Sequence, residues 1–457
     1  MNKRAGFSPI EVLLAATIFA MLVTVIVGAF IFARESTANA GVRARAVYLA
    51  EEGLEAARNI RDSAYANLPL GTYGLVQSGG VWTLGGSVDT TGIYTRSLTV
   101  AAANTYRKTV TSTVTWPQAV GTGSVSGVTE FANWTSSWLT AVMAGSYDAA
   151  GTTDGLKVAT VGNYAYVVRG GGSPNFMILN ISNPAAPALV GSLALANTPT
   201  NITVSGNYAY VVGTSPTAEL QIIAINNPAT PTVVGTWNSS GAGNGLTIAV
   251  SGNYAYIGQA SSQTSDEFMV VNVSNPAAPT LAGSYSNKLA MNGIVLSGNY
   301  AFVGTDKSSA ELLTLDISNP AAPTLANSFN IPGAGNVNAI ALAGTTLFAV
   351  HGSDVVAINV SNPIAPVVLG TVTSSGKKTT INDLAAKPDS SFVFLGTDDP
   401  TGEFQVVNVN DPTNMSIGRV VDTAGIVQGI AWNAATDTVV AATTADTQEV
   451  ITMVRSE

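Results

Sequence analysis

Residues 162–193 read GNYAYVVRGGGSPNFMILNISNPAAPALVGSL, and variants of this stretch return along the chain. Its first segment, GNYAY, has further copies or worn variants that begin at Gly206, Gly252, Gly298, Gly344, Pro388 and Asn433. Successive copies start about 44 to 46 residues apart. A repeat of this length with four short strand-like runs predicts one blade of a β-propeller.

The strands of one blade can be placed from the alternation of apolar and turn residues. In the first repeat we predict strands at residues 156–161, 164–169, 176–181 and 189–193, with an Asn-Pro-x-x-Pro turn before the last one. The seventh repeat ends before its fourth strand. Residues 141–147, AVMAGSY, resemble that missing strand. We therefore predict a seven-bladed propeller over residues 139–457, closed by a strand from its own N-terminal side.

The third predicted strand of several repeats reads LQIIAIN, FMVVNVS, LLTLDIS or FQVVNVN. These segments resemble the Leu-Val-Ile-Val-Asp strand after which the LVIVD-repeat family is named. The resemblance covers about two thirds of the chain. It implies a β-propeller, often on secreted or surface proteins, and it implies no single activity.

The N-terminus is a second, unrelated feature. It reads MNKRAGFSPIEVLL, and residues 12–33 carry no charge, a length that would span about 30 Å of hydrocarbon as a helix. Lys3 and Arg4 precede the run, which predicts a transmembrane helix with the remainder of the chain outside the cytoplasm. A plain signal-anchor is one alternative. A cleaved signal peptide ending at Ala38-Asn39-Ala40 is another.

The segment Gly6-Phe7-Ser8-Pro9-Ile10-Glu11 resembles the leader of type IV pilins and pseudopilins. The resemblance implies that a prepilin peptidase cuts between Gly6 and Phe7 and that the new N-terminus at Phe7 is methylated. It also implies that Glu11 pairs with the terminal amine of a neighbouring subunit during assembly. An amine and a carboxylate, each unfavourable alone in an apolar setting, are tolerated as a pair. Pro9 departs from the leucine that is commoner in the family.

Between the leader and the repeats, the patterning predicts three segments. Residues 7–62 are expected to form one transmembrane and scaffold helix, in which Ala46, Leu49, Ala50, Gly53, Ala57 and Ile60 share a face. Residues 63–117 are expected to form a small pilin-like β-sheet domain. Residues 118–138, rich in Gly, Ser and Thr, are expected to be a linker. The predicted fold is thus mainly β, with a long N-terminal helix and small sheet before the propeller.

Composition limits the chemistry. Of the 457 residues, 10% are charged, the net charge is −9, cysteine is absent and one histidine occurs. Without Lys/Arg clusters an acidic chain is a poor nucleic-acid binder, because phosphate contacts supply most of that affinity. We expect no metal, no cofactor and no catalytic residue. A carboxylate-based propeller enzyme stays as the alternative.

Loops that differ between blades are the candidate binding sites, because specificity usually lies in variable loops on a fixed scaffold. The candidates in these loops are Gly170, Asn175, Gln259, Asp266, Glu267, His351, Asp398 and Asp399. His351 is expected at a variable loop edge, and the paired carboxylates are expected at solvated loop tips. The repeated Tyr pairs, such as Tyr164 and Tyr166, are expected in the core.

The resulting prediction is a pilin-like filament subunit, minor or decorating, that displays a propeller outside the cell for adhesion or for binding a ligand. The expected partners are the prepilin peptidase, other pilin subunits, the membrane through residues 12–33 and an extracellular ligand. The expected location is the cytoplasmic or inner membrane before assembly and the cell surface afterwards. The alternatives are a pseudopilin of a secretion system and a membrane-tethered enzyme.

Overall fold

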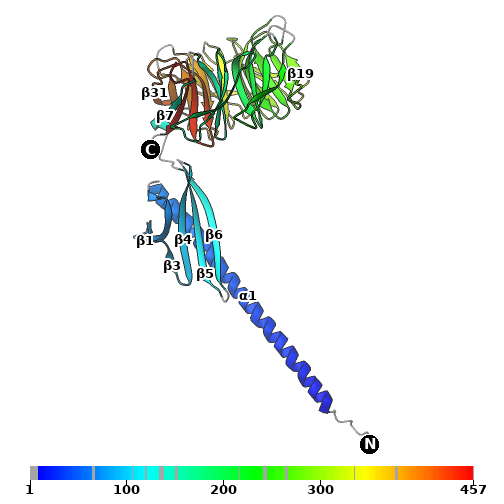
Figure 1. Ribbon diagram of the computed structural model, residues 1–457, viewed down its shortest axis with the longest axis vertical. Coiled ribbons are helices and arrows are strands. Elements are labelled where there is room, and N and C mark those ends of the chain that lie inside the picture. The colour runs from blue at the N-terminus through cyan, green and yellow to red at the C-terminus, as the bar shows by residue number, and fades with distance from the viewer. Residues whose placement is uncertain are drawn as a thin grey trace. The chain divides into compact units, whose positions relative to one another are not determined.

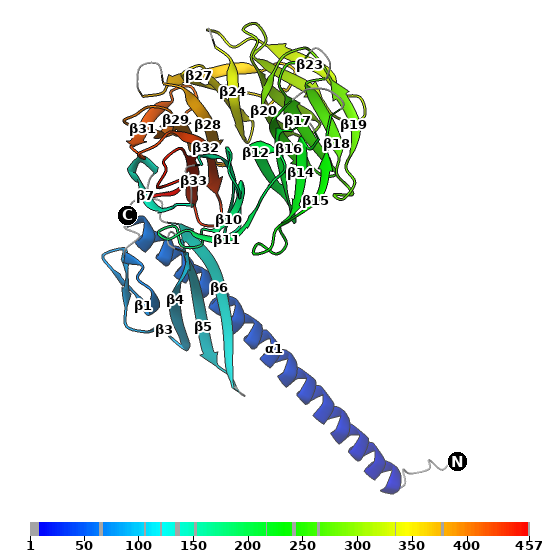
Figure 2. The ribbon, with the colours of Figure 1, turned by 45° about the horizontal axis from the view of Figure 1, so that its top comes forward.

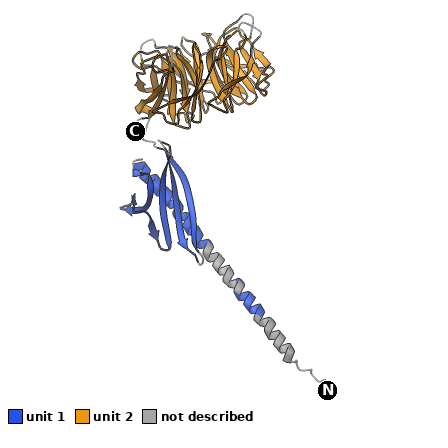
Figure 3. Ribbon diagram, in the orientation of Figure 1, with its two compact units in different colours: residues 1–135 blue, residues 136–457 orange. Residues whose placement is uncertain are grey.

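The computed structural model describes residues 9–63, 67–104, 107–118, 121–132, 138–149, 153–215, 217–239, 244–262, 266–333, 335–375 and 379–455. The chain divides into two compact units, residues 1–135 and 136–457 (Figure 3). Each unit is described by itself below.

The first unit is built on the helix α1, Pro9–Ser63 (Figure 1). The helical face predicted from the sequence is confirmed: Ala46, Leu49, Ala50, Gly53, Ala57 and Ile60 are all buried. They pack against a sheet, because small and aliphatic residues at helical spacing present one apolar stripe. By contrast, the described residues Met21–Val27 are exposed along their whole length.

The predicted fold needs a correction at this helix. A transmembrane helix was expected within residues 7–62, but no helix in the described part of the chain is long and apolar enough to cross a membrane. A crossing takes about 20 consecutive apolar residues. The described side chains of the apolar run are those of Met21–Val27 and Ala29, which is a shorter stretch.

A six-stranded antiparallel sheet completes the first unit. Its order is β2-β1-β4-β5-β6, and β3 pairs with β4. The strands are β1 (Gly71–Ser78), β2 (Val81–Gly85), β3 (Asp89–Thr91), β4 (Tyr94–Asn104), β5 (Arg107–Pro117) and β6 (Thr122–Ala132).

The predicted linker over residues 118–138 is wrong across most of its length. Residues 122–132 form β6, which pairs with β5 along its whole length. Gly123, which reads as a flexible residue, has a packing role here: a Cβ at this position would come within 2.3 Å of the ring of Trp116, itself buried. The glycine lets the indole lie across the strand.

The second unit consists of seven four-stranded antiparallel sheets. Blades one to three are β8 (Gly155–Val161), β9 (Tyr164–Arg169), β10 (Phe176–Asn180), β11 (Ala188–Leu193); β12 (Thr198–Ser205), β13 (Tyr208–Thr214), β14 (Leu220–Ala224), β15 (Thr232–Trp237); and β16 (Gly245–Ser251), β17 (Tyr254–Gln259), β18 (Phe268–Asn272), β19 (Thr280–Tyr285). Blades four and five are β20 (Met291–Ser297), β21 (Tyr300–Thr305), β22 (Leu312–Asp316), β23 (Thr324–Phe329); and β24 (Val337–Ala343), β25 (Thr346–His351), β26 (Asp354–Asn359), β27 (Val367–Thr373). Blades six and seven are β28 (Ile381–Ala386), β29 (Phe392–Thr397), β30 (Phe404–Asn408), β31 (Ser416–Val421); and β32 (Val427–Asn433), β33 (Thr438–Thr443), β34 (Val450–Arg455), β7 (Ala141–Tyr147).

The blades form a closed ring (Figure 2). The first strand of each blade contacts the first strand of the next, and β32 of the last blade contacts β8 of the first. The predicted closure is confirmed: β7 pairs antiparallel with β34, from Ala141 opposite Arg455 to Tyr147 opposite Val450. A single turn of 3-10 helix, η2 (Trp138–Thr140), precedes β7, and the ring of Trp138 packs edge-on against Phe394 of blade six at 4.6 Å.

The repeated motifs serve the packing between and within blades, as predicted. Tyr166, Tyr210 and Tyr256 are buried in the clusters between neighbouring blades. In the Asn-Pro turns the asparagine side chain caps the turn, since Asn183 Oδ1 accepts the backbone N–H of Ala185 at 3.2 Å. In five blades a glycine of the fourth strand lies against the corresponding turn of the next blade: a Cβ on Gly235 would come within 2.0 Å of the Pro276 carbonyl oxygen.

Candidate functional site: the propeller channel

The residues of the pilin-like leader lie at the margin of what the structure describes. Gly6 and Phe7 are outside the described residues. Glu11 lies within α1, but its side chain is outside the described set. Their roles in cleavage, methylation and assembly stay predictions.

Two of the predicted binding-loop residues are buried and bind the loop between their blade and the next. Asn175 Oδ1 accepts the N–H of Leu195 at 2.7 Å, and its Nδ2 donates to the Asn197 carbonyl at 3.0 Å. Glu267 is fully buried, and its Oε2 accepts from Lys288 N at 3.0 Å and from Ser286 Oγ at 2.8 Å. Glu267 is therefore not at a solvated loop tip, which corrects the prediction.

This arrangement repeats around the ring. The residue just before the third strand is a buried acid or amide in six blades: Asn175, Glu219, Glu267, Glu311, Glu403 and Glu449. Each accepts a backbone N–H from the connection that follows its blade; in the last blade the donor is Ala149, just after β7. Blade five has Ser353 at this position, and its backbone carbonyl accepts the N–H of Ser374 at 3.0 Å. An alignment of the repeats on their third strands would have shown in the sequence that a glutamate recurs directly before this strand.

A second buried polar position lies at the end of the second strand in six of the blades. Arg169, Gln259, Thr305, His351, Thr397 and Thr443 occupy it, and all are buried. His351 ends β25, at the loop edge as expected, but its side chain is buried. At this position the threonine hydroxyls donate to carbonyls of their own blades, whereas Arg169 and Gln259 reach the preceding blade. Arg169 Nη2 lies 3.0 Å from Glu449 Oε1, and Gln259 Nε2 donates to Glu219 Oε2 at 3.2 Å.

His351 lies in a space left by two glycines. A Cβ on Gly333 would be 3.3 Å from its Cε1, and a Cβ on Gly335 would be 3.0 Å from its Nε2. In blade four, Glu311 Oε2 accepts the N–H of Ile331, at the start of the same loop. Among the described atoms, His351 Nε2 and Glu311 Oε1 are both buried without a hydrogen-bond partner.

Burial raises the pKa of two of these glutamates, Glu219 and Glu449. Desolvation raises the pKa of Glu219, and hydrogen bonds from Ser239 and Gln259 oppose that rise. Desolvation also raises the pKa of Glu449, and the Ala149 N–H and the Arg169 charge oppose it. These shifts in pKa arise from burial of the two carboxyl groups in the packing between blades.

The remaining predicted loop residues do not converge on one site. Asp266 Oδ2 accepts from Ser284 Oγ at 2.5 Å, and Asp398 Oδ1 accepts from Thr380 N at 2.6 Å. Asp399 is buried, which corrects its expected place at a solvated loop tip, and it caps a turn by accepting both the N–H and the hydroxyl of Thr401. Gly170 is exposed and donates its N–H to the Asp154 carbonyl at 3.0 Å. No three His, Asp or Glu side chains of the described residues come together as metal ligands.

The structure instead gathers polar side chains in the central channel, which sequence analysis did not single out. A cavity of about 470 Å³ is lined by residues of the first strands of all seven blades. Its lining comprises Lys157, Val158, Thr200, Asn201, Leu246, Thr247, Ile248, Asn292, Gly293, Ile294, Asn338, Ala339, Ile340, Asn382, Asp383 and Ile430.

A β-bulge near the start of each first strand builds this lining. Thr200, Asn292 and Asn382 are extra residues at such bulges, and each bridges to the first strand of the next blade. Thr200 Oγ1 donates to the Gly245 carbonyl at 2.5 Å. Asn292 Nδ2 and Asn382 Nδ2 donate to the carbonyls of Val337 and Val427 at 3.3 and 3.1 Å.

One ion pair crosses the cavity wall. Lys157 Nζ of blade one lies 2.9 Å from Asp383 Oδ2 of blade six, and the same oxygen accepts the Ile430 N–H at 3.1 Å. Asp383 is the one carboxylate among the described lining residues, and a lysine neutralises it. The cavity therefore presents amides, hydroxyls and a compensated charge pair.

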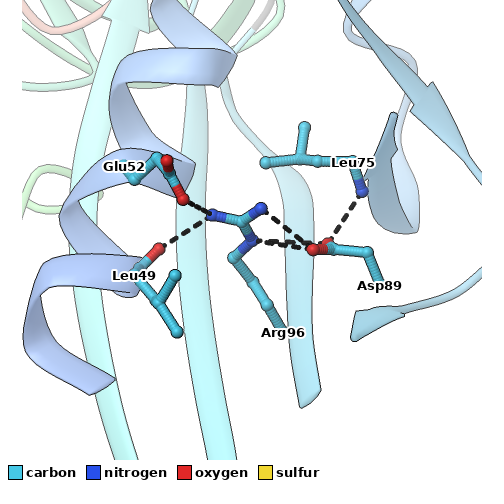
Figure 4. Close-up of polar contacts among 5 residues, drawn as sticks. All are labelled: Leu49, Glu52, Leu75, Asp89 and Arg96. Carbon is cyan, nitrogen blue, oxygen red and sulfur yellow. Dashed lines mark hydrogen bonds and ion pairs between the residues drawn. The ribbon is translucent and has the colours of Figure 1, made fainter. Parts of the chain in front are cut away.

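The first unit has its own polar centre, around Arg96 (Figure 4). The guanidinium donates to the Leu49 carbonyl and to Glu52 Oε2 of α1, both at 3.0 Å, and to Asp89 Oδ2 at 2.9 Å. Asp89 Oδ1 also accepts the Leu75 N–H at 2.9 Å. The side chain of Arg96 is 6% exposed, so this network ties the helix to β1, β3 and β4 within the core of the unit.

The fold and these sites define a seven-bladed β-propeller protein. Four segments, residues 150–194, 199–239, 242–287 and 290–331, match the model of the LVIVD repeat, which confirms the resemblance over the first four blades. No curated protein sequence matches the chain.

Several solved propellers have a similar fold. The β-propeller domain of Cps50 (Swd1) from Myceliophteria thermophila superposes with a TM-score of 0.55 at 13% identity, over 69% of this chain and 100% of that one. The WD40 repeats of RRP9 give 0.55 at 8% identity, over 69% and 97% of the two chains. A chain of the mitotic checkpoint complex gives 0.54 at 13%, over 70% and 95%. At such identities the likeness concerns the fold alone.

Proposed function

We propose that the protein is a pilin-like filament subunit that displays its propeller at the cell surface to bind an extracellular ligand or partner. The observation that carries the proposal is the contrast between two parts of α1. One face of the later part is buried against the sheet of its own unit, and Met21–Val27 have no such cover.

The exposed part is apolar, which is costly in water. Met21 is 71% exposed, Val25 70% and Ile26 59%. Contiguous exposed apolar surface of this kind is typical of an interaction surface. Packing against the same helix of neighbouring copies would cover it, as in a filament whose core consists of helices.

The leader supports the same proposal. Cleavage by a prepilin peptidase between Gly6 and Phe7 would create a terminal amine four residues before Glu11. That amine and the Glu11 carboxylate of a neighbouring copy would pair in the filament core. The partners in this proposal are therefore the peptidase and other pilin subunits.

The propeller supplies the binding function in this proposal, and no catalytic role is included. Support for a binding role comes from the channel lining, where amides and hydroxyls surround the paired Lys157 and Asp383. Two carboxylates placed for acid–base catalysis would require a different lining.

Mass spectrometry of the N-terminal peptide, from whole cells and from sheared surface filaments, tests the proposal. We expect a peptide that begins at Phe7, heavier by one methyl group, in the sheared fraction. E11Q should abolish recovery in that fraction, while E51Q, a change at an exposed glutamate of the same helix, should not. A peptide that retains Met1–Gly6, or equal recovery of the two variants, would contradict the proposal.

A further inference from the structure

The channel cavity has the volume of a small-molecule site. At about 470 Å³ it lies inside the range of about 300–1,000 Å³ that such sites occupy. The closed ring of first strands holds its wall, and the bridges made by Thr200, Asn292 and Asn382 fix neighbouring blades at this level. The cavity is therefore preformed and does not depend on a mobile loop.

The wall of the cavity is polar and carries no uncompensated charge among the described residues. The amides of Asn201, Asn292, Asn338 and Asn382 and the hydroxyls of Thr200 and Thr247 line it. Amides and hydroxyls both donate and accept hydrogen bonds. Such a wall suits an uncharged ligand with several hydroxyl or amide groups. It disfavours an anion or a cation, since Lys157 and Asp383 already neutralise each other at 2.9 Å.

One level of the cavity is aliphatic. Val158, Ile248, Ile294 and Ile430 line it next to the polar residues. These four side chains keep 5 to 7% exposure, whereas most core residues of the following strands have none. Their remaining surface therefore borders the void. A pyranose ring has hydroxyls around its edge and C–H groups on its faces, so polar walls beside an aliphatic level match both parts of the ring.

From this combination we infer that the channel binds a neutral sugar residue. Hydrogen bonds from the asparagine amides to the ring hydroxyls would set its orientation, and contact with the isoleucines would add affinity by burying C–H groups. The inference deepens the ligand-binding part of the proposed function. It does not depend on filament assembly.

Ligand-observed NMR with the purified full-length chain tests the inference. The probes are glucose, galactose, mannose and N-acetylglucosamine, with glucuronate and glucosamine as charged comparisons. N292L removes an amide from the wall at nearly constant volume. T247V removes a hydroxyl and keeps the shape. N207L changes an exposed asparagine in the turn between β12 and β13 and serves as the matched control.

We expect at least one neutral sugar to bind saturably, with affinity at least tenfold lower in N292L and T247V and unchanged in N207L. The thermal midpoint of each variant is measured alongside, and T247V provides the decisive comparison if N292L unfolds early because its bridge to Val337 is lost. Binding that is equal in all variants, binding of charged sugars only, or no binding of any neutral probe at millimolar concentration would each overturn the inference. Filament recovery is scored separately, so either proposal can fail alone.

Discussion

Arg169 in the first blade and Glu449 in the last form an ion pair in which Nη2 and Oε1 are 3.0 Å apart and both side chains are almost inaccessible to water. The pair spans the seam where the ring closes. The same seam is crossed by a bond from Asn433 Nδ2 to the Gly162 carbonyl at 2.9 Å. The two ends of the repeat array are therefore held by specific polar bonds as well as by β7.

Neutralising Glu449 should destabilise the propeller more than neutralising Glu219. E449Q leaves the buried Arg169 charge unpaired, but burial already raises the pKa of Glu449 toward its neutral form, so we expect a loss of about 1–3 kcal/mol of the free energy of unfolding. Urea unfolding of the full chain, followed by tryptophan fluorescence, measures the loss. E219Q is the matched control, because the partner of Glu219 at the same ring position is the neutral Gln259. Equal losses in the two variants would contradict the assigned role of the Arg169 charge.

Glu219 should give stability an unusual pH dependence. Because burial raises its pKa above the ordinary value of 4.5, the folded chain binds this proton more tightly than the unfolded chain does. The contribution to the free energy of unfolding is therefore full below pH 4.5 and is lost as pH rises through the raised pKa. The difference in stability between E219Q and the unmodified chain should increasingly favour E219Q with rising pH. A difference that stays constant from pH 4 to 7 would refute this.

The glycine of the fourth strand should not tolerate a methyl group. In G235A the new Cβ would lie 2.0 Å from the Pro276 carbonyl oxygen of the next blade, so the two blades must separate. We expect a loss of about 1–3 kcal/mol, typical of overpacking. G171A, where nothing lies within 4 Å of the added Cβ, is the control. Thermal midpoints of the two variants give the comparison, and similar midpoints would show that the contact between blades yields easily.

Removing the guanidinium of Arg96 should loosen the first unit. R96M leaves the Leu49 carbonyl and Asp89 without their donor, and we expect a loss of about 1.5–3 kcal/mol from these charge-assisted bonds. R58M removes an exposed pair with Glu55 and should cost below about 1 kcal/mol. Hydrogen exchange of the β4 amides reports on this unit separately from the propeller. Unchanged protection in R96M would contradict a stabilising role.

The repeat made the propeller predictable from sequence. Spacing and alternation gave seven blades, and the predicted strand at residues 141–147 coincides with β7. Side-chain direction at strand ends was not predictable in the same way. Glu267 reads as a loop residue, and only the neighbouring blade shows that its carboxylate turns inward to accept from Lys288 N.

Two further features could not be predicted from the sequence, for related reasons. Gly123 lies in a stretch rich in Gly, Ser and Thr, a composition that predicts a flexible linker. Its packing role depends on the ring of Trp116 in the paired strand, which leaves no room for a Cβ. The four channel asparagines, Asn201, Asn292, Asn338 and Asn382, lie in four separate repeats, and the other three repeats have different residues there, so a single repeat shows no binding motif. Their convergence is a property of the closed ring and becomes visible only when all first strands are placed together.

Ring closure by β7 also has a mechanical consequence. The chain enters the propeller through Trp138, packed against blade six, and then through β7, hydrogen-bonded to the C-terminal strand β34 in blade seven. If a bound ligand holds the propeller while tension arrives from the N-terminal side, the load passes first to the packing of this indole and then to the β7–β34 hydrogen bonds. The resistance of the protein to detachment under flow would then be set at this seam, and the channel would stay intact until the seam opens.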